Sequence, residues 1–200
     1  MDSAFARYSD DDVAALIEQN PLAWLGSSEN ALSMTPLPML VERDPTGRLT
    51  TLIGHMARSN PLFAVLQEDP SCHFLFMGPQ GYIGPSLVSD PGWAPTWNYA
   101  AARITADVRF DAAYTDTAVQ KLVGKMEATR HDPWAVSSMG ERYDRMLSAI
   151  IGFRAEIREI RATFKLGQDE RAEVFREIVN GPLDPRLVDL MQQFRGRASK

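Results

Sequence analysis

The spacing of apolar residues changes several times along the chain, and each change marks a predicted element. Apolar residues that recur every three or four positions are typical of helices, and alternating ones of half-buried strands. The helical spacing predicts a first helix from the N-cap Ser9 to Asn20-Pro21. It predicts further helices over residues 61–68, 116–130, 141–150, 169–180 and 184–194.

Alternating or continuous apolar runs predict the strands between these helices. The strands cover residues 22–26, 31–41, 49–55, 71–77, 97–110 and 151–166. Pro36 and Pro38 predict an edge position or a bulge for the second run, since proline has no N–H to donate. In the last run the inward parity shifts between Ile157 and Ile160, which predicts a β-bulge. Residues 78–86 and 90–99, rich in Gly, Pro and aromatic residues, predict ordered loops.

This order of elements argues against a doubly wound α/β sheet. It favours a mainly β fold, an antiparallel barrel with peripheral helices. A length of 200 residues with 44% hydrophobic content suits one domain with a small appendage. We expect the barrel domain in residues 1–180. Residues 181–200 are then a C-terminal helix and tail, packed on the barrel or on a partner subunit.

The composition limits which kinds of reactive or metal-binding site the chain can form. The single cysteine, Cys72, excludes an intrachain disulfide, and its apolar neighbours predict a buried strand residue rather than a nucleophile. No cysteine–histidine spacing is typical of zinc, so no metal site is predicted. His73 and His131 have no evident partner. Neither a signal peptide nor an apolar run of ~20 residues is present, so we expect a cytoplasmic protein without a membrane span.

The net charge of −5 disfavours a broad nucleic-acid surface. The one basic candidate is Arg195-Gly196-Arg197 with Lys200, for which a solvated, frayed end is the simpler interpretation.

Candidate chemistry gathers in the segment Gly54-His55-Met56-Ala57-Arg58-Ser59-Asn60-Pro61. A strand ends and a helix begins here, with Asn60 as N-cap and Pro61 at the first helical position. Backbone N–H groups and the helix dipole make such a junction suitable for phosphate, and Arg58 adds a fork of donors. A structural alternative stays open, with Arg58 paired to a carboxylate, His55 packed and Asn60 only capping. Function is favoured because binding residues concentrate in such loops.

Three further strings follow in order: Gly78-Pro79 with Tyr82-Ile83-Gly84-Pro85-Ser86, Pro95-Thr96-Trp97-Asn98-Tyr99, and Phe164-Lys165-Leu166-Gly167-Gln168. Together with the first, over residues 14–180, they resemble the PaiB-type FMN-binding negative transcriptional regulators of bacteria. The resemblance implies an FMN-binding split β-barrel, similar to flavin reductases and pyridoxamine-phosphate oxidases. It also implies a homodimer that holds FMN at the subunit interface.

The resemblance also implies which residues bind FMN. Arg58 and Asn60 meet the phosphate, and the full set is Thr35, His55, Met56, Ala57, Arg58, Asn60, Tyr82, Trp97, Asn98, Lys165 and Gln168. Two departures stand out: Pro36 replaces a frequent His, and Gly167 and Asp169 flank Gln168 where relatives often have Ser or Thr and Asn. Trp97 and Tyr99 face one side of their strand and Asn98 the other. On periodicity alone, one of those aromatic residues is expected in the core.

By this resemblance the protein is a flavin- or redox-linked transcriptional regulator. One alternative is a flavin-dependent oxidoreductase acting on an unknown small molecule, and another is a binding module that has lost FMN. No activated nucleophile or carboxylate pair is evident, so no catalytic residue is assigned and enzymatic activity stays open. The negative net charge does not support DNA as a partner, and no helix-turn-helix with a basic recognition helix is evident.

Overall fold

The computed structural model describes residues 4–28 and 33–198 and contains a seven-stranded sheet. The strands are β1 (Leu22–Ser27), β2 (Met34–Pro38), β3 (Leu40–Arg43), β4 (Leu49–Ala57), β5 (Ser71–Ile83), β6 (Thr96–Asp111) and β7 (Ile150–Lys165). Their order is β2-β1-β5-β6-β7-β4-β3, so β2 is an edge strand as its prolines predict. The β1–β2, β1–β5, β3–β4 and β4–β7 pairs are antiparallel. The predicted mainly β fold is confirmed.

Six α-helices accompany the sheet within the described residues, each close to a predicted position. They are α1 (Asp10–Gln19), α2 (Pro61–Glu68), α3 (Thr115–Glu127), α4 (Arg142–Ser148), α5 (Ala172–Val179) and α6 (Pro185–Ala198). Short 3-10 turns cover Ala4–Ala6, Pro85–Leu87, Ala112–Tyr114 and Val136–Met139. Ser9 caps α1 as predicted: its Oγ accepts from the Asp12 N–H at 3.3 Å, and its own N–H donates to the Asp12 carboxylate at 2.9 Å.

Two strand predictions need correction. The predicted run 31–41 divides into β2, which pairs with β1, and β3, which pairs with β4, while residues 31 and 32 lie outside the described residues. The predicted loop over 78–86 is wrong for residues 78–83, which continue β5. A Cβ at Gly78 would meet the end of the Leu16 side chain, which would have to move to make room. Pro79 is tolerated because the pairing of β5 with β1 ends at Leu75, before the proline.

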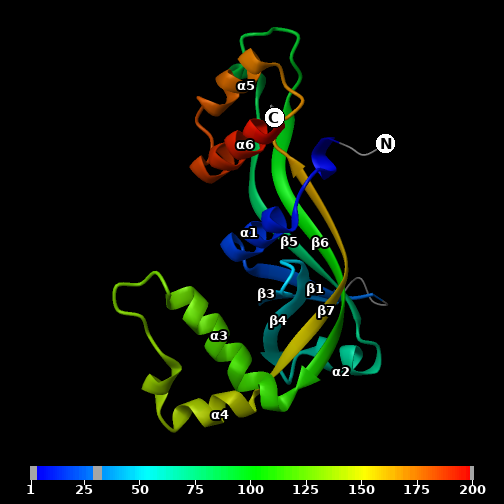
Figure 1. Ribbon diagram of the computed structural model, residues 1–200, viewed down its shortest axis with the longest axis vertical. Coiled ribbons are helices and arrows are strands. Elements are labelled where there is room, and N and C mark those ends of the chain that lie inside the picture. The colour runs from blue at the N-terminus through cyan, green and yellow to red at the C-terminus, as the bar shows by residue number, and fades with distance from the viewer. Residues whose placement is uncertain (1–3, 29–32, 199–200) are drawn as a thin grey trace. The chain divides into compact units, whose positions relative to one another are not determined.

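Contacts divide the chain into two units, which we describe separately. Unit 1 comprises residues 1–16, 77–102 and 161–200, and unit 2 comprises residues 17–76 and 103–160. The three long strands, β5, β6 and β7, contribute residues to both units, and Figure 1 traces them. The predicted parity shift in β7 is confirmed, because burial favours odd positions through Ile157 and even positions from Ile160 onward.

In unit 1, helices α5 and α6 lie side by side (Figure 1). Each contributes a buried phenylalanine, Phe175 and Phe194. Phe164 of β7 stacks on Phe194 of α6, with ring centroids 4.6 Å apart. The basic C-terminal segment is not frayed through residue 197. Arg195 donates to the Gln168 carbonyl at 2.9 Å, and Arg197 pairs with the Asp12 carboxylate of α1. The predicted frayed end is therefore wrong for these two arginines, although Arg197 is exposed to solvent as predicted, and Lys200 lies outside the described residues.

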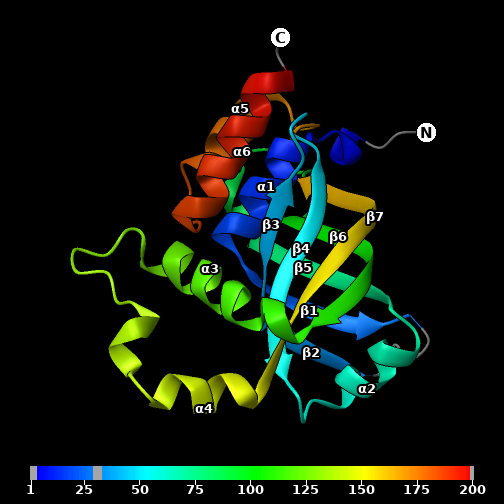
Figure 2. The same cartoon turned by 60° about the horizontal axis from the view of Figure 1, so that its bottom comes forward.

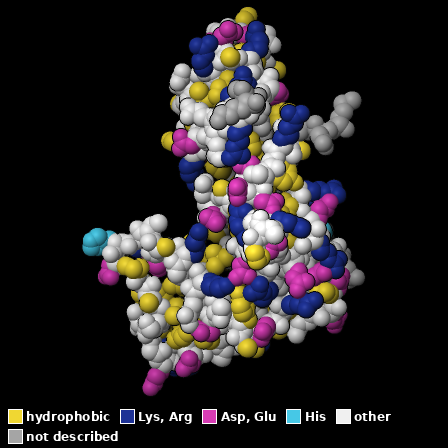
Figure 3. All heavy atoms as spheres, in the orientation of Figure 1, with side chains coloured by type: hydrophobic (Ala, Val, Ile, Leu, Met, Phe, Trp, Pro, Cys, Tyr) yellow, Lys and Arg dark blue, Asp and Glu magenta, His cyan; other side chains and the backbone are white. Residues whose placement is uncertain are grey.

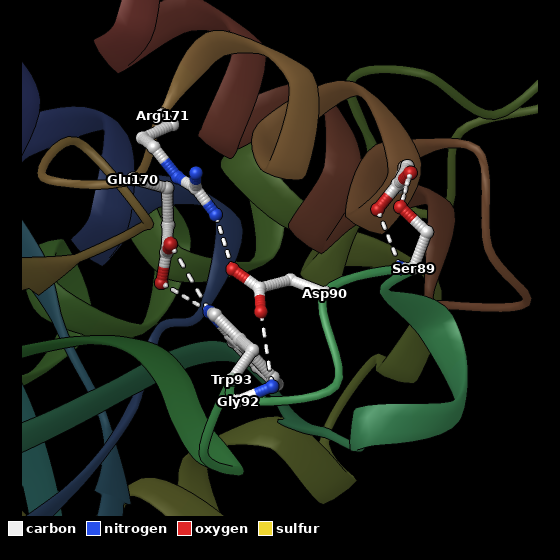
Figure 4. Close-up of polar contacts among 7 residues, drawn as sticks. Ser89, Asp90, Gly92, Trp93, Glu170 and Arg171 are labelled. Atoms are coloured by element: carbon white, nitrogen blue, oxygen red, sulfur yellow. Dashed lines mark hydrogen bonds and ion pairs between the residues drawn. The ribbon is translucent and has the colours of Figure 1, made fainter.

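The loop over residues 88–95 is held by polar contacts to α5 and to the two residues that precede it (Figure 4). The Trp93 indole N–H donates to both Glu170 carboxylate oxygens, at 3.1 and 3.2 Å. Arg171 pairs with Asp90, and the Ser89 hydroxyl donates to Glu177 at 2.6 Å. The prediction of an ordered loop holds for this segment.

In unit 2, strand β4 lies between β3 and β7, as Figure 2 shows. Leu52 and Ile53 face opposite sides of β4 and are both fully buried, as is Phe153 of β7. Cys72 is buried as predicted, and burial raises the pKa of its thiol to about 12. Such a thiol is inert as a nucleophile. His73, for which the sequence showed no partner, contacts the Thr105 hydroxyl at 3.2 Å and the Ser28 hydroxyl at 3.3 Å.

Candidate functional site

The candidate phosphate site is built at the end of β4, where consecutive side chains face opposite sides of the sheet. Met56 is 1% exposed and packs in the core of unit 2, whereas His55 is half-buried on the other side. Because residues that differ by one position cannot share a strand face, His55 and Met56 do not line one wall together. Ala57 and Arg58, which follow them, are exposed.

Asn60 caps α2 as the sequence predicts. Its Oδ1 accepts from the Leu62 N–H at 3.0 Å, and its carbonyl accepts from the Phe63 N–H at 2.9 Å. Its Nδ2 donates to the Thr35 hydroxyl at 3.2 Å, which joins two predicted site residues of distant segments. These bonds satisfy two N–H groups at the helix start, so the helix offers fewer free donors for a phosphate than the sequence suggested.

Arg58 supplies the donors that the capped helix does not. Its backbone N–H donates to the Ala149 carbonyl at 3.0 Å, which holds the turn in place. Its guanidinium is exposed and forms no ion pair or hydrogen bond with any residue that the structure describes. A free guanidinium fork beside a helix start matches a phosphate in charge and geometry. The residues present therefore fit the phosphate end of FMN.

The aromatic residues predicted for the flavin site lie in unit 1. The rings of Tyr82 and Trp97 are 5.9 Å apart between centroids, and the Trp97 indole N–H donates to the Gln80 amide oxygen at 2.9 Å. Trp97 is 49% exposed, so it is not a core residue. Asn98 faces the other way as periodicity predicts. It is buried, and its Nδ2 contacts the Met191 sulfur of α6 at 3.6 Å.

The last two predicted residues also lie in unit 1 and have local partners. The Lys165 ammonium donates to the Thr96 hydroxyl. Gln168 closes a turn around Gly167: its Oε1 accepts from the Leu166 N–H at 2.7 Å, and its Nε2 donates to the Phe164 carbonyl at 2.5 Å. Gly167 has a φ of +76°, a conformation that favours glycine and suits this turn.

The predicted residues thus form two groups, one in each unit. Unit 2 holds Thr35, His55, Met56, Ala57, Arg58 and Asn60, and unit 1 holds Tyr82, Trp97, Asn98, Lys165 and Gln168. Thr35 and Asn60 are in direct contact, as are Tyr82 and Trp97. Which of them bind FMN stays a prediction.

A cavity of about 270 Å³ beside His55 was missed by sequence reasoning. Its walls come from α3, from α4 and from residues 134–139 between them. Burial lowers the pKa of His55, so its imidazole is neutral near pH 7. The apolar period of α3 was visible in the sequence, but nothing there indicated that it faces His55.

Comparison with known proteins identifies the fold. The FAD and heme binding protein from Mycobacterium smegmatis superposes with a TM-score of 0.60 at 14% identity, covering 88% of this chain and 79% of that one. The flavocytochrome Anf3 from Azotobacter vinelandii superposes with a TM-score of 0.57 at 17% identity, covering 80% of this chain and 69% of that one. This likeness confirms the predicted split β-barrel.

Sequence comparison identifies the family. A Bacillus subtilis protein, "Protease synthase and sporulation protein PAI 2", is 25% identical over 151 residues, which are 70% of this chain and 72% of that protein. An uncharacterized protein of Emericella nidulans is 26% identical, and the match covers 77% of this chain and 78% of that protein. In the described part of the chain, no helix has the length and apolar character needed to cross a membrane. The model of the family "Putative FMN-binding domain" matches residues 1–159. The chain therefore belongs to this FMN-binding family, as its PaiB-type resemblance predicted, and its cofactor is FMN.

Proposed function

We propose that this chain is an FMN-binding regulator, linked to flavin or redox state, that acts through another protein rather than directly on DNA. The observation that carries the flavin part is the Arg58 guanidinium beside the start of α2, which pairs with no side chain in residues 4–28 and 33–198. It supplies a cation for the FMN phosphate without breaking an existing ion pair. The regulatory part is supported by the Bacillus subtilis relative, which is named for protease synthase and sporulation.

The distribution of charge argues against direct DNA binding. Contacts to DNA phosphates need clustered Lys and Arg side chains. The chain has 21 Lys and Arg residues but 26 Asp and Glu residues, so its net charge is negative. On the face drawn in Figure 3, basic and acidic side chains are interspersed. The one concentrated basic segment contains Arg195 and Arg197. Arg195 already donates to the Gln168 carbonyl, and Arg197 already pairs with Asp12.

A gel-shift experiment with the protein's own upstream DNA tests this part. We expect no sequence-specific complex at nanomolar protein and physiological salt, where specific affinities are typically ~10⁻⁸ M or better. Deletion of the gene should nevertheless change transcript levels. A specific complex that survives competitor DNA would show that regulation is direct. Unchanged transcripts, together with turnover of a reduced nicotinamide and added FMN, would favour the oxidoreductase alternative.

We also propose that the chain forms a homodimer through an apolar face of unit 2. Trp24 of β1 pairs with Leu75 of β5 on one side and with Pro36 of β2 on the other, so the three side chains share a sheet face. Trp24, Leu75 and neighbouring Leu22 and Met34 are exposed. A contiguous apolar surface of this kind is typical of an interface. Because Pro36 and Pro38 weaken the edge for strand pairing, the second copy is expected to pack on the face.

A further inference from the structure

Thr35 and Asn60 join two distant segments of unit 2 by one hydrogen bond. The Asn60 Nδ2 donates to the Thr35 hydroxyl at 3.2 Å. Thr35 belongs to the edge strand β2 and Asn60 to the start of α2, which lie near each other in Figure 2. Both side chains are half-buried. The bond therefore links the edge of the sheet to the turn that carries Arg58.

The backbone of β2 explains why the Thr35 hydroxyl is directed toward Asn60. Thr35 lies opposite Leu25 in the antiparallel β1–β2 pair, and directly opposed residues share a sheet face. Because Leu25 is fully buried, Thr35 faces the interior side of the sheet, whereas its neighbour Met34 is exposed on the other side. Pro36 restricts the residue before it to extended backbone, which keeps Thr35 in this orientation.

The bond to Thr35 holds the Asn60 side chain in its capping position. Asn60 Oδ1 accepts from the Leu62 N–H at 3.0 Å, so its Nδ2 is directed away from the helix. The Thr35 Oγ1 accepts from Nδ2 on that side. Both ends of the amide are therefore bound, and the side chain cannot rotate without losing a hydrogen bond.

Asn60 in turn holds the turn around Arg58. The Asn60 N–H donates to the Ala57 carbonyl at 3.0 Å, and the Arg58 N–H donates to the Ala149 carbonyl at 3.0 Å. The backbone on both sides of the Arg58 side chain is thus fixed. A cation carried by a fixed turn loses less conformational entropy on binding a ligand than one carried by a loose turn.

We propose that Thr35 is a positioning residue for the FMN phosphate, which acts through Asn60 on the turn that presents Arg58 and does not itself contact FMN. This role rests on the proposed phosphate site at Arg58. It differs from the direct contact with FMN that the family resemblance implies for Thr35.

Titration of FMN into the flavin-free protein, followed by flavin fluorescence, measures the role of Thr35. Thr35→Val keeps the shape of the side chain but cannot accept from Asn60, so it should weaken FMN binding about three- to tenfold. Thr35→Ser keeps the hydroxyl and should bind FMN within about twofold of the parent. Thr117→Val, the same change at an exposed position of α3, is the control and should bind as the parent does.

Substitution of Asn60 separates positioning from direct contact. Asn60→Ser keeps a capping oxygen but loses the amide donor, so it should bind FMN about as weakly as Thr35→Val. Adding Thr35→Val to Asn60→Ser should then change the affinity by less than about twofold, because the two residues act through one bond. If Thr35→Val weakened binding equally in both backgrounds, Thr35 would contact FMN itself and the positioning role would be overturned.

Hydrogen exchange of the flavin-free protein gives a readout that does not depend on FMN. Peptides covering residues 57–66 should exchange faster in Thr35→Val and at the parent rate in Thr35→Ser, while peptides of α3 should not change. Circular dichroism would verify that each variant is folded. Unchanged exchange in Thr35→Val would overturn the positioning role, as would unchanged FMN affinity in Thr35→Val when Arg58→Ala is weakened. Unchanged affinity in Arg58→Ala would instead overturn the phosphate site, and the role of Thr35 with it.

Discussion

At the scale of single residues, His55 makes stability depend on pH. Its folded pKa lies below the ordinary value of 6.5 because burial disfavours the charged ring. The unfolded chain then binds more protons than the folded one below about pH 6.5, so stability falls as pH drops through this range. Above that value both states hold a neutral imidazole, and the contribution of His55 does not change.

Urea unfolding of the parent and of His55→Phe at about pH 7.5 and 5.5 isolates this effect. Phenylalanine takes up no proton on unfolding, so the variant should gain stability relative to the parent as the pH is lowered. Carboxylates titrate in both proteins and cancel in the difference. If the two proteins differed in unfolding free energy by the same amount at both pH values, the lowered pKa of the half-buried His55 would be contradicted.

Residue-scale prediction succeeded where a local rule applies. The cap at Asn60, the buried Cys72 and the opposite directions of Trp97 and Asn98 all follow from rules about neighbouring positions. The partners of Arg195 and Arg197 did not follow, because Gln168 and Asp12 come from other segments. Pairing between distant segments leaves no trace in the local pattern.

At the scale of elements, the start of α3 packs closely on β7 in unit 2. The Gly152 N–H donates to the Thr115 hydroxyl at 2.9 Å. A Cβ at Gly152 would lie 2.7 Å from the Thr115 Cα, a backbone atom that cannot move alone. Gly124, within α3, has no atom within 4 Å of such a Cβ.

These two glycines give a matched pair of alanine substitutions. Gly152→Ala should destabilise the protein by about 1–3 kcal/mol, because the helix must shift to admit the methyl group. Gly124→Ala should stabilise it by about 0.5–1 kcal/mol through helix propensity. Chemical denaturation of both variants measures these changes. Equal effects would show that α3 and β7 are not in close contact at Thr115.

The elements themselves were predictable within a few residues where apolar periods are long, as in α3 and β7. The error over residues 78–83 arose because Gly and Pro usually mark loops. Here Gly78 makes room for Leu16, and Pro79 occupies a stretch of β5 beyond its pairing with β1. The cavity beside His55 could not be predicted, since its walls come from segments that meet only after folding.

At the scale of the whole molecule, the apolar face around Trp24 predicts a dimer. Light scattering at micromolar concentration should give about twice the 22.3 kDa mass of one chain. Trp24→Lys should shift this mass toward the monomer, because a charge cannot be buried in an apolar interface without cost. Met126→Lys, which alters an exposed methionine of α3, is the control and should remain dimeric. A parent protein at the monomer mass would reject the homodimer.

The central claim, that the chain holds FMN by its phosphate at Arg58, is tested most directly by titrating FMN into the flavin-free protein and into Arg58→Ala. Loss of a charge-assisted contact of roughly 1.5–3 kcal/mol should weaken FMN binding about ten- to a hundredfold. The FMN affinity of Arg58→Lys should lie between those of the parent and Arg58→Ala, because lysine keeps the positive charge but lacks the planar set of N–H donors. Arg109→Ala removes another exposed arginine and should bind as the parent does. A parent that shows no flavin absorbance as purified and no saturable FMN binding, or an Arg58→Ala variant with unchanged affinity, would contradict the claim.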